Sequence, residues 1–285
     1  MASLRLAIQK SGRLSEKSLD IIAECGIHFS NSSKRLVAKC SNFPLEILYL
    51  RDDDIPGYVA DGVADIGIVG ENVLIEKEKQ VSVVKKLGFS KCRLSLAIPR
   101  GEKYHGVSDM EGKYIATSYP NILKQYFKEH GVKADVHEIS GSVEIAPAIN
   151  LADAICDIVS TGSTLIGNGL KEVEVVMRSE AILFSTSNLE AEKQAILDQL
   201  IFRIESVNKA RKNKYIVLNA PERSVDTILQ ILPGMKSPTV TPLAEDNWYS
   251  VSSVIAEDQF WEIIEQLKAA GAEGILVMPI EKMIL

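Results

Sequence analysis

Cysteine and histidine are scarce in this chain of 285 residues, which holds only four of each. The cysteines form no C-x-x-C pair, which argues against a zinc knuckle and a redox dithiol, and we expect four buried thiols. They are Cys25, Cys40, Cys92 and Cys156. The histidines form neither an H-x-x-x-H nor an H-E-x-x-H pattern, so no zinc site and no Ser-His-Asp constellation is predicted. Any chemistry should therefore rest on binding and positioning rather than on a protein nucleophile.

Long apolar runs and basic runs are also missing. No segment approaches the roughly 18 consecutive apolar residues of a membrane-spanning helix, and residues 1–8 lack the extended apolar core of a signal peptide. We therefore expect a cytoplasmic protein with no membrane partner. The formal net charge is −6, from 32 Lys and Arg against 38 Asp and Glu, and without a Lys/Arg cluster no nucleic-acid binding is expected. An anionic ligand would need a local site.

The amino-terminal two thirds of the chain alternates predicted strands with predicted helices, as α/β proteins do. The length suits two or three domains, and 46% apolar with 25% charged residues is typical of globular chains. The predicted strands cover 4–9, 45–50, 64–69, 93–99, 113–118, 136–139 and 154–159. The predicted helices run from an N-cap at Ser15 to Gly26, from 121 to 130, onward from Gly141–Glu144, and from 189 to 209.

After a polar, basic break at 209–214 the pattern changes. The remaining predicted elements are a strand at 215–219, a helix at 222–232, a short strand within 239–243, a strand at 249–256, a helix at 260–270 and a strand at 275–278. Their order, β-α-β-β-α-β, is ferredoxin-like. A compact module of this kind after a two-lobed body indicates an appended regulatory or oligomerising domain.

The most informative segment runs from Asp153 to Thr164, where a buried strand ends in Ser-Thr-Gly-Ser-Thr ahead of a short predicted helix. Such a loop directs backbone N–H groups, hydroxyls and a helix N-terminus at one point, and glycine lets the backbone approach a phosphate. Asp153 and Asp157 should share a strand face, where they could bind ribose hydroxyls or a divalent cation. An ordinary strand-to-helix turn with a Ser/Thr cap would have a similar composition. The upstream carboxylates favour a phosphorylated sugar.

Other candidates follow predicted strands, where ligands of open α/β sheets bind. Lys10 and Arg13 flank Ser-Gly and could clamp phosphates, although a solvated basic turn is more common. Glu71 could line a cleft or cap a helix. Arg93 could contact a ligand or pair with a surface acid, and Tyr119 could contact a ligand or pack in the core.

Seven collinear blocks resemble the long form of the ATP phosphoribosyltransferase family, the first enzyme of histidine biosynthesis. They are Lys10–Leu14, Arg51–Pro56, Asp65–Val73, Cys92–Ala97, Ala116–Pro120, Asp153–Thr164 and Pro279–Met283. The resemblance implies two α/β lobes shaped like a type II periplasmic binding protein, followed by an ACT-like module. It assigns 1–92 and 180–208 to the first lobe, 93–179 to the second and 211–285 to the module. The implied reaction transfers the phosphoribosyl group of phosphoribosyl pyrophosphate to N1 of ATP, with Mg²⁺, and releases pyrophosphate.

The resemblance also implies roles for particular residues. Those expected to bind phosphoribosyl pyrophosphate are Asp153, Ala154, Asp157, Ser160, Thr161, Gly162, Ser163 and Thr164. Those expected near ATP or pyrophosphate are Lys10, Arg13, Glu71, Arg93, Tyr119 and Glu144. Those expected to bind histidine as a feedback inhibitor are Asn219, Thr239, Val254 and Gly274. The resemblance assigns no residue to the metal ion.

One position departs from the family pattern: Asn219 stands where some members carry Asp, so it can accept a hydrogen bond but lacks the charge. The resemblance further implies a homo-oligomer, a dimer that can form a hexamer. Three alternatives stay open at this stage. The chain could be a non-catalytic, two-lobed protein that binds a small anion and carries a sensor domain, or a catalytic subunit that depends on a separate regulatory partner. The last module could also serve only to stabilise an oligomer.

Overall fold

The computed structural model describes residues 2–30, 36–232 and 234–284, and the chain divides into two compact units. The first unit takes in the residues up to 20 and 27–196, and the second takes in 21–26 and the residues from 197 onward. Each unit is described by itself. Within the described residues no helix is long and apolar enough to cross a membrane.

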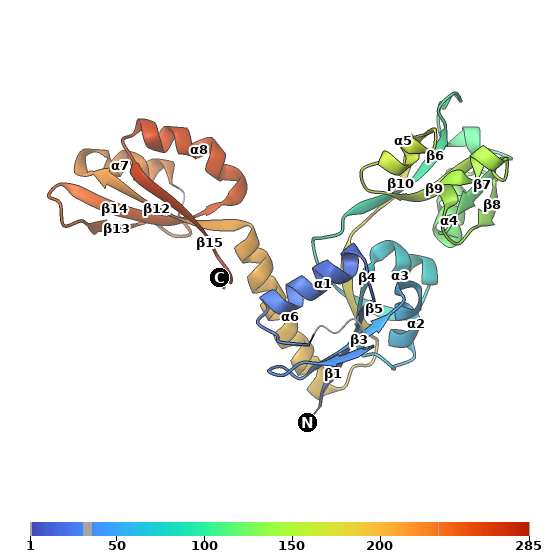
Figure 1. Ribbon diagram of the computed structural model, residues 1–285, viewed down its shortest axis with the longest axis horizontal. Coiled ribbons are helices and arrows are strands. Elements are labelled where there is room, and N and C mark those ends of the chain that lie inside the picture. Colours follow the sequence, from blue (N-terminus) through green and yellow to red (C-terminus); the bar gives the residue numbers. More distant parts are fainter. Residues whose placement is uncertain (1, 31–35, 233, 285) are drawn as a thin grey trace. The chain divides into compact units, whose positions relative to one another are not determined.

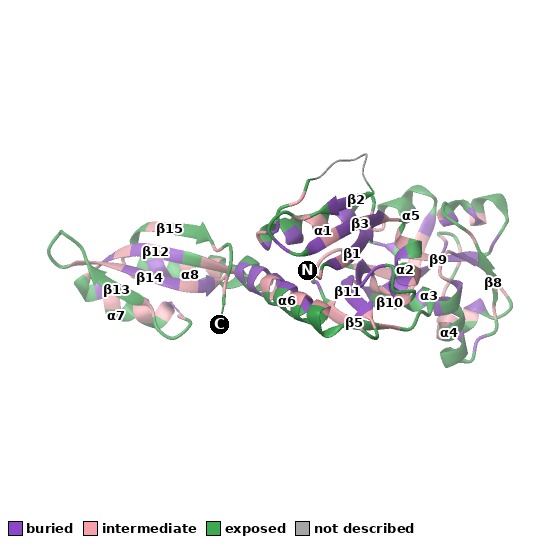
Figure 2. Ribbon diagram, turned by 90° about the horizontal axis from the view of Figure 1, so that it is seen from below, coloured by how far each residue is buried: buried purple, intermediate pink, exposed green. Residues whose placement is uncertain are grey.

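The first unit contains a six-stranded sheet in the order β2-β3-β1-β4-β11-β5 (Figure 1). Its strands are β1 (Leu4–Gln9), β2 (Val37–Lys39), β3 (Leu45–Leu50), β4 (Ile66–Gly70), β5 (Val81–Lys86) and β11 (Ala181–Thr186). The accompanying helices are α1 (Arg13–Glu24), α2 (Ile55–Ala60) and α3 (Glu71–Lys77). β1 runs parallel to β3 and β4, whereas β11 enters antiparallel between β4 and β5. The central strands are buried on both faces, as parallel strands covered by helices are (Figure 2).

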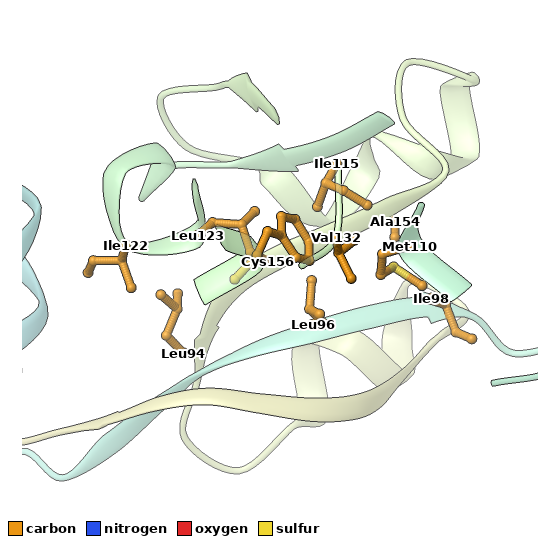
Figure 3. Close-up of a cluster of buried hydrophobic side chains, with 11 residues drawn as sticks. Leu94, Leu96, Ile98, Met110, Ile115, Ile122, Leu123, Val132, Ala154 and Cys156 are labelled. Atoms are coloured by element: carbon orange, nitrogen blue, oxygen red, sulfur yellow. The ribbon is translucent and has the colours of Figure 1, made fainter. Parts of the chain in front are cut away.

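The second sheet of this unit has five strands in the order β10-β6-β9-β7-β8. They are β6 (Cys92–Pro99), β7 (Tyr114–Thr117), β8 (Asp135–Glu138), β9 (Ala154–Val159) and β10 (Leu170–Ser179). The helices are α4 (Pro120–His130) and α5 (Ser163–Gly167), with short 3-10 turns at Val107–Met110, Val143–Ile145 and Pro147–Ile149. Figure 3 shows the core of this sheet, in which side chains of β6, β7, β9 and α4 pack together. The chain enters the sheet through β6 and leaves it through β10, which pair antiparallel.

The second unit consists of most of α6 (Ala191–Arg211) and a four-stranded antiparallel sheet in the order β13-β14-β12-β15. Its elements are β12 (Asn213–Pro221), α7 (Glu222–Ile231), β13 (Thr239–Pro242), β14 (Trp248–Ala256), α8 (Glu257–Ala269) and β15 (Glu273–Pro279). Alternate residues of β12 and β14 are buried. They form one core with α7 and α8, which lie on one face of the sheet (Figure 1).

The predicted fold class is confirmed: two α/β sheets are followed by a β-α-β-β-α-β module. The predicted strands 4–9, 45–50 and 154–159 have the bounds that the structure shows, and Gly131 ends α4 in a left-handed conformation as expected. The apolar pattern identified these strands because 45–50 alternates buried with half-buried residues, whereas 4–9 and 154–159 contain a run of three buried residues.

Other predictions were wrong. Ser15 does not cap α1, because the helix begins two residues earlier, at Arg13. Ser15 therefore belongs to the first turn of α1, and it is buried. The helix predicted after Gly141–Glu144 is only a pair of 3-10 turns, because Pro147 lacks an N–H and Asn150 adopts a left-handed φ of 58°. The predicted break at 209–214 is shorter than expected, since α6 continues to Arg211 and β12 begins at Asn213.

Not all four cysteines are buried thiols. Cys25 and Cys156 are buried, whereas Cys40 and Cys92 are half-buried because they lie at strand ends. All four are free.

Gly67 on β4 is needed for close packing rather than for backbone freedom. A Cβ atom at this position would lie 2.6 Å from Phe184 Cζ and 2.8 Å from Ile55 Cγ2. We expect Gly67→Ala to lower the free energy of unfolding by about 1–3 kcal/mol, the usual cost of overpacking a core. At Gly57, in α2, nothing lies within 4 Å of the place that a Cβ would take, so Gly57→Ala should be neutral or stabilising by up to about 1 kcal/mol. Urea unfolding of both variants would test this, and equal midpoints would contradict it.

Candidate phosphate-binding site

A cavity of about 370 Å³ lies at the carboxyl end of β9. It is lined by Arg13, Glu144, Asp157, Ile158, Val159, Ser160, Thr161, Gly162, Ser163, Thr164 and Leu165. The structure therefore brings the whole predicted loop together with one of the two predicted basic residues near the amino terminus. A larger cavity, of about 500 Å³, lies between α3, α4 and β10 and contains no part of this loop. We place the candidate site at the smaller cavity because the polar groups converge there.

The loop holds its shape through Gly162. This residue has φ 83° and ψ 0°, a left-handed conformation that L side chains rarely adopt, and it forms the N-cap of α5 without a capping side chain. The Thr161 and Ser163 hydroxyl oxygens lie 3.1 Å apart. The first N–H groups of a helix have no partner within it, so those at the start of α5 are available to an anion beside the two hydroxyls.

Asp157 lies on β9 shortly before this loop, in a half-buried position. Burial raises its pKa above the ordinary aspartate range, and the negative charge of Glu144 raises it further, while the N–H of Ile158 opposes this by hydrogen bonding. Glu144 lines the same cavity. The site thus places two carboxylates beside hydroxyl and amide donors, which suits a ligand that carries both hydroxyl groups and a phosphate.

Arg13 is the first residue of α1 and faces this cavity. The preceding Gly12 has φ 96°, and its carbonyl accepts a hydrogen bond from the N–H of Glu16 at 3.1 Å. Lys10 is exposed and is held through its backbone N–H, which donates to the carbonyl of Leu50 at 2.8 Å. Of the two predicted phosphate-clamping cations, only Arg13 lines the cavity.

Arg93, on β6, is occupied by protein partners. Its guanidinium donates to both carboxylate oxygens of Glu172 on β10, at 2.5 and 2.6 Å, and to the carbonyl of Ser160 at 3.1 Å. Hydrogen bonding to Arg93 lowers the pKa of Glu172, and hydrogen bonding to Glu172 raises the pKa of Arg93. The sequence analysis missed Glu172, because its partner lies 79 residues away and no local pattern marks the pair.

Tyr119 precedes α4 and is held by α3, which belongs with the first sheet. Burial is the largest cause that raises the pKa of the Tyr119 phenol, and the negative charge of Asp157 is the next. The Asn72 side chain forms a hydrogen bond with the phenol and opposes this rise. Asn72 is itself fixed by Ser179, whose hydroxyl donates to Asn72 Oδ1 at 2.7 Å. The hydrogen bond between Tyr119 and Asn72 therefore connects the second sheet to α3, which accompanies the first sheet.

Glu76 fixes the helix that follows Tyr119. Its carboxylate accepts the N–H groups of Asn121 and Ile122 at 3.0 and 3.1 Å and so caps α4 from a neighbouring helix. Pro120 has no N–H, and the Leu123 N–H donates to the Tyr119 carbonyl, so the start of α4 is satisfied. Asn72 lies in a segment that the sequence marked because it follows a buried strand, but its partner was not predicted, and Glu76 carried no signal because it acts on residues more than 40 positions away.

The structure does not bring every predicted residue to the loop. Asp153 precedes β9, at the opposite end of the strand from the loop, about 13 Å from Asp157 along an extended chain. Its carboxylate accepts the N–H of Tyr114 at 2.8 Å. Ala154 is fully buried at the start of β9. The pairing of Asp153 with Asp157 in one site is therefore not what the structure shows.

Glu71 lies at a separate, smaller cavity of about 240 Å³ near the strands that connect the two sheets. Lys86 donates to its carboxylate at 2.9 Å, and the rest of the lining is Lys91, Cys92, Arg178, Ser179 and Glu180. Glu71 thus follows β4 as expected but takes part in an ion pair outside the loop cavity.

The four predicted effector positions lie on different strands of the third sheet. Asn219 on β12 and Gly274 on β15 are adjacent: a Cβ at Gly274 would lie 3.3 Å from Asn219 Nδ2. Thr239 begins β13 and pairs with Ser252 of β14, while Val254 lies further along β14 opposite Tyr215. Of these four positions in the described part of the chain, Asn219 and Gly274 are the pair for which the structure shows close contact.

The described residues contain no cluster of three or more His, Cys, Asp or Glu side chains that could hold a metal ion by themselves. The oxygen-rich lining of the loop cavity nevertheless fits Mg²⁺, which typically takes one or two carboxylates and completes its shell with substrate phosphates and water. Glu144 and Asp157 are the carboxylates available for this purpose.

The fold and the site define a class: an α/β protein with two linked sheets and, at the carboxyl end of a strand, a cavity whose polar lining suits a phosphorylated ligand. A histidine kinase sensor domain with similarity to periplasmic binding proteins has the same type of fold, at TM-score 0.50 and 11% identity, over 73% of this chain and 90% of its own. That likeness concerns the fold alone.

The chain belongs to the ATP phosphoribosyltransferase family. The family model of that description matches residues 51–206, and the model described as the HisG C-terminal domain matches residues 210–282. The ATP phosphoribosyltransferase of Cytophaga hutchinsonii is 63% identical over 99% of this chain and 98% of its own length. That of Parabacteroides distasonis is 59% identical over 99% of this chain and 100% of its own. The family places the chain among the pentosyltransferases, and the predicted resemblance is confirmed.

A solved structure agrees with the same assignment. The ATP phosphoribosyl transferase (HisG:HisZ) complex from Thermotoga maritima matches at TM-score 0.60 and 30% identity, over 71% of this chain and 98% of that chain.

Proposed function

We propose that this protein transfers the phosphoribosyl group of phosphoribosyl pyrophosphate to N1 of ATP and releases pyrophosphate, as the first step of histidine biosynthesis. The observation that carries the proposal is the loop cavity, where hydroxyls, helix N–H groups, Asp157 and Arg13 surround one space. Membership of the ATP phosphoribosyltransferase family supplies the reaction.

The phosphoribosyl pyrophosphate is held by the loop. The 5′-phosphate accepts hydrogen bonds from the Thr161 and Ser163 hydroxyls and from the first N–H groups of α5, which together replace its hydration shell. Asp157 accepts hydrogen bonds from the ribose hydroxyls, and Gly162 allows the backbone to come close to the phosphate. Ser160 and Thr164 complete the lining of the same cavity.

The chemistry needs positioning more than a protein nucleophile. The N1–C1 bond forms as the bond from C1 to the pyrophosphate oxygen breaks, with inversion at C1, and the electron pair leaves with pyrophosphate. Arg13 lines the cavity and is the cation available to the departing pyrophosphate charge. Lys10, Glu71, Tyr119 and Glu144 stay predictions for contacts to ATP or pyrophosphate, and of these Glu144 lines the loop cavity together with Asp157.

Mg²⁺ is the cofactor that this reaction requires in our proposal. When bound, it supplies positive charge that neutralises the leaving pyrophosphate. Glu144 and Asp157 would hold it from the protein side, and the substrate's phosphates would provide most of its ligands.

The domain organisation that we propose assigns residues 1–92 and 180–208 to a first catalytic lobe, 93–179 to a second, and 211–285 to an ACT-like regulatory module. Histidine is the proposed inhibitor, bound by residues that include Asn219, Thr239, Val254 and Gly274. We further propose that the protein works in the cytoplasm as a homo-oligomer, a dimer that can form a hexamer. A match to the HisG C-terminal domain within the same chain supports regulation without a separate regulatory subunit.

Turnover of ATP with phosphoribosyl pyrophosphate tests the proposed function directly. We expect the product to form, seen as a change in the ultraviolet absorbance of the adenine ring, only when both substrates and Mg²⁺ are present. Histidine should lower this rate, whereas arginine at the same concentration should not. Absence of product with both substrates would contradict the catalytic proposal, and a rate unaffected by histidine would contradict the regulatory one.

A non-catalytic, two-lobed anion-binding protein was the alternative that the sequence left open. Membership of the ATP phosphoribosyltransferase family favours the enzyme over it. The same turnover assay separates the two, because a binding protein would take up phosphoribosyl pyrophosphate in calorimetry but would form no product.

A further inference from the structure

An arginine–glutamate pair joins two neighbouring strands, β6 and β10, beside the 160–164 loop. Arg93 on β6 donates to both carboxylate oxygens of Glu172 on β10, at 2.5 and 2.6 Å, and the Ser95 hydroxyl donates to Glu172 Oε1 at 2.8 Å. The Arg93 and Glu172 side chains are 28% and 24% exposed, so the pair is largely shielded from water. Two parallel hydrogen bonds fix the orientation of both planar groups.

The third contact of Arg93 leads into the loop. Its Nη1 donates to the carbonyl of Ser160, the first loop residue, at 3.1 Å. Ser160 follows Val159, the residue of β9 that pairs with Arg93 in the sheet. β10 is irregular just after Glu172, where its register against β6 shifts before Glu174, and such bulges re-aim side chains. The guanidinium is therefore held by Glu172 on one side and holds the loop on the other.

We propose, on the basis of the function proposed above, that Arg93 and Glu172 are positioning residues that set the conformation of the 160–164 loop and do not themselves bind substrate phosphate. Arg93 neutralises Glu172 rather than presenting a free charge to the cavity, and it is absent from the cavity lining. The pair acts on substrate only through the Ser160 carbonyl and the loop that follows it.

Positioning and direct binding predict opposite effects for the same substitutions. If Arg93 bound pyrophosphate directly, Glu172→Gln would free a positive charge and lower the KM for phosphoribosyl pyrophosphate, and Arg93→Lys would keep much of the binding. If Arg93 positions the loop, Glu172→Gln loosens its anchor, and lysine cannot replace the planar fork that bonds Glu172 and Ser160 together. Both variants should then bind phosphoribosyl pyrophosphate less well.

The experiment measures steady-state KM for each substrate in the full-length protein, after turnover by the wild-type protein has established the reaction. We expect Glu172→Gln and Arg93→Lys each to raise the KM for phosphoribosyl pyrophosphate by about tenfold to a hundredfold, with the KM for ATP changed less than about twofold. Absence of wild-type turnover would count against the proposed function. Wild-type turnover with an unchanged or lower KM in Glu172→Gln would overturn only the present inference.

Two further variants guard against a general loss of structure. Arg211 and Glu24 form a second forked pair, at 2.8 and 2.7 Å, in the other unit of the protein. Arg211→Lys should leave both KM values unchanged, and an equal change there would overturn the inference.

Ser95→Ala removes one hydrogen bond to Glu172 and should raise the KM for phosphoribosyl pyrophosphate by a smaller factor. If Glu172→Gln fails to fold, Ser95→Ala and Arg93→Lys test the positioning role in its place. An unchanged KM for phosphoribosyl pyrophosphate in both of these variants would then overturn the proposal.

Discussion

Replacing Gly162 by valine should lower kcat/KM for phosphoribosyl pyrophosphate by about a hundredfold or more. Gly162 has φ 83°, and this conformation is costly for a β-branched residue. Valine would therefore move the loop away from the geometry that directs the Thr161 and Ser163 hydroxyls and the first N–H groups of α5 at one point. The kinetics of both substrates, measured over a range of each, would show whether the loss concerns phosphoribosyl pyrophosphate alone.

Gly62 offers a matched control for backbone strain. It has φ 71°, and nothing lies within 4 Å of a Cβ built on it. Gly62→Val should therefore destabilise the fold to a similar extent without lowering kcat/KM for phosphoribosyl pyrophosphate. Thr161→Ala, which leaves the backbone free to keep its shape, should still raise the KM for phosphoribosyl pyrophosphate far more than that for ATP. Equal effects on the two substrates would contradict the assignment of this loop.

Asp157→Asn should cause the second largest loss in kcat/KM for phosphoribosyl pyrophosphate. The substitution keeps the shape of the side chain but removes the negative charge that, in our proposal, accepts hydrogen bonds from the ribose hydroxyls. A hydrogen bond to a charged group contributes about 1.5–3 kcal/mol, which corresponds to a loss in kcat/KM of roughly 10-fold to 150-fold. The loss should fall on phosphoribosyl pyrophosphate, and initial rates at saturating ATP would measure it.

The pH dependence of this variant provides a separate check. Burial, and next the charge of Glu144, raise the pKa of Asp157. Below that pKa the carboxyl group is protonated and loses its charge, so in the wild-type protein kcat/KM for phosphoribosyl pyrophosphate should rise with pH through a midpoint above the ordinary aspartate value of about 3.9. In Asp157→Asn this rise should disappear. Titration of the substrate's own phosphates is common to both proteins and cancels in their ratio.

Stability should change in the opposite sense to activity in Asp157→Asn. An acid whose folded pKa is raised binds its proton more tightly in the folded state, so its contribution to stability is present at low pH and is lost as pH rises through the folded value. At neutral pH the ionised Asp157 is therefore a cost to folding, and the asparagine variant should unfold at an equal or higher urea concentration than wild type. A variant that is clearly less stable and has an unchanged KM would refute the role of Asp157.

Local pattern predicted much of the fold because many elements bury a regular face. β1, β3 and β9 were predicted with their observed bounds, since each alternates or runs continuously apolar into a core. β10 was missed because it is mostly half-buried and carries charged residues such as Lys171 and Glu172 along its length. Its pairing with β6 depends on residues more than 70 positions away, which no local window contains.

The candidate site, too, was predicted only in part from the sequence. The loop at 160–164 was found from its glycine and hydroxyl residues after a buried strand, and the upstream carboxylates favoured a phosphorylated sugar over an ordinary capped turn. Asp153 was assigned to the same site from its spacing, but in the structure it lies at the other end of β9 and binds the Tyr114 N–H. Strand periodicity gives the face of a side chain and says nothing about which end of the sheet forms the site.

The sequence by itself determined the two α/β sheets, the β-α-β-β-α-β module and the family, and it marked the candidate phosphate loop. These follow from features that are local in the chain: apolar period, turn residues and collinear motifs. Only the tertiary structure decided that Arg93 pairs with Glu172 and supports Ser160, and that Asn72 and Glu76 of α3 hold Tyr119 and α4. Hydrogen bonds of this kind depend on distances of about 3 Å between residues far apart in sequence, and those distances exist only once the chain has folded.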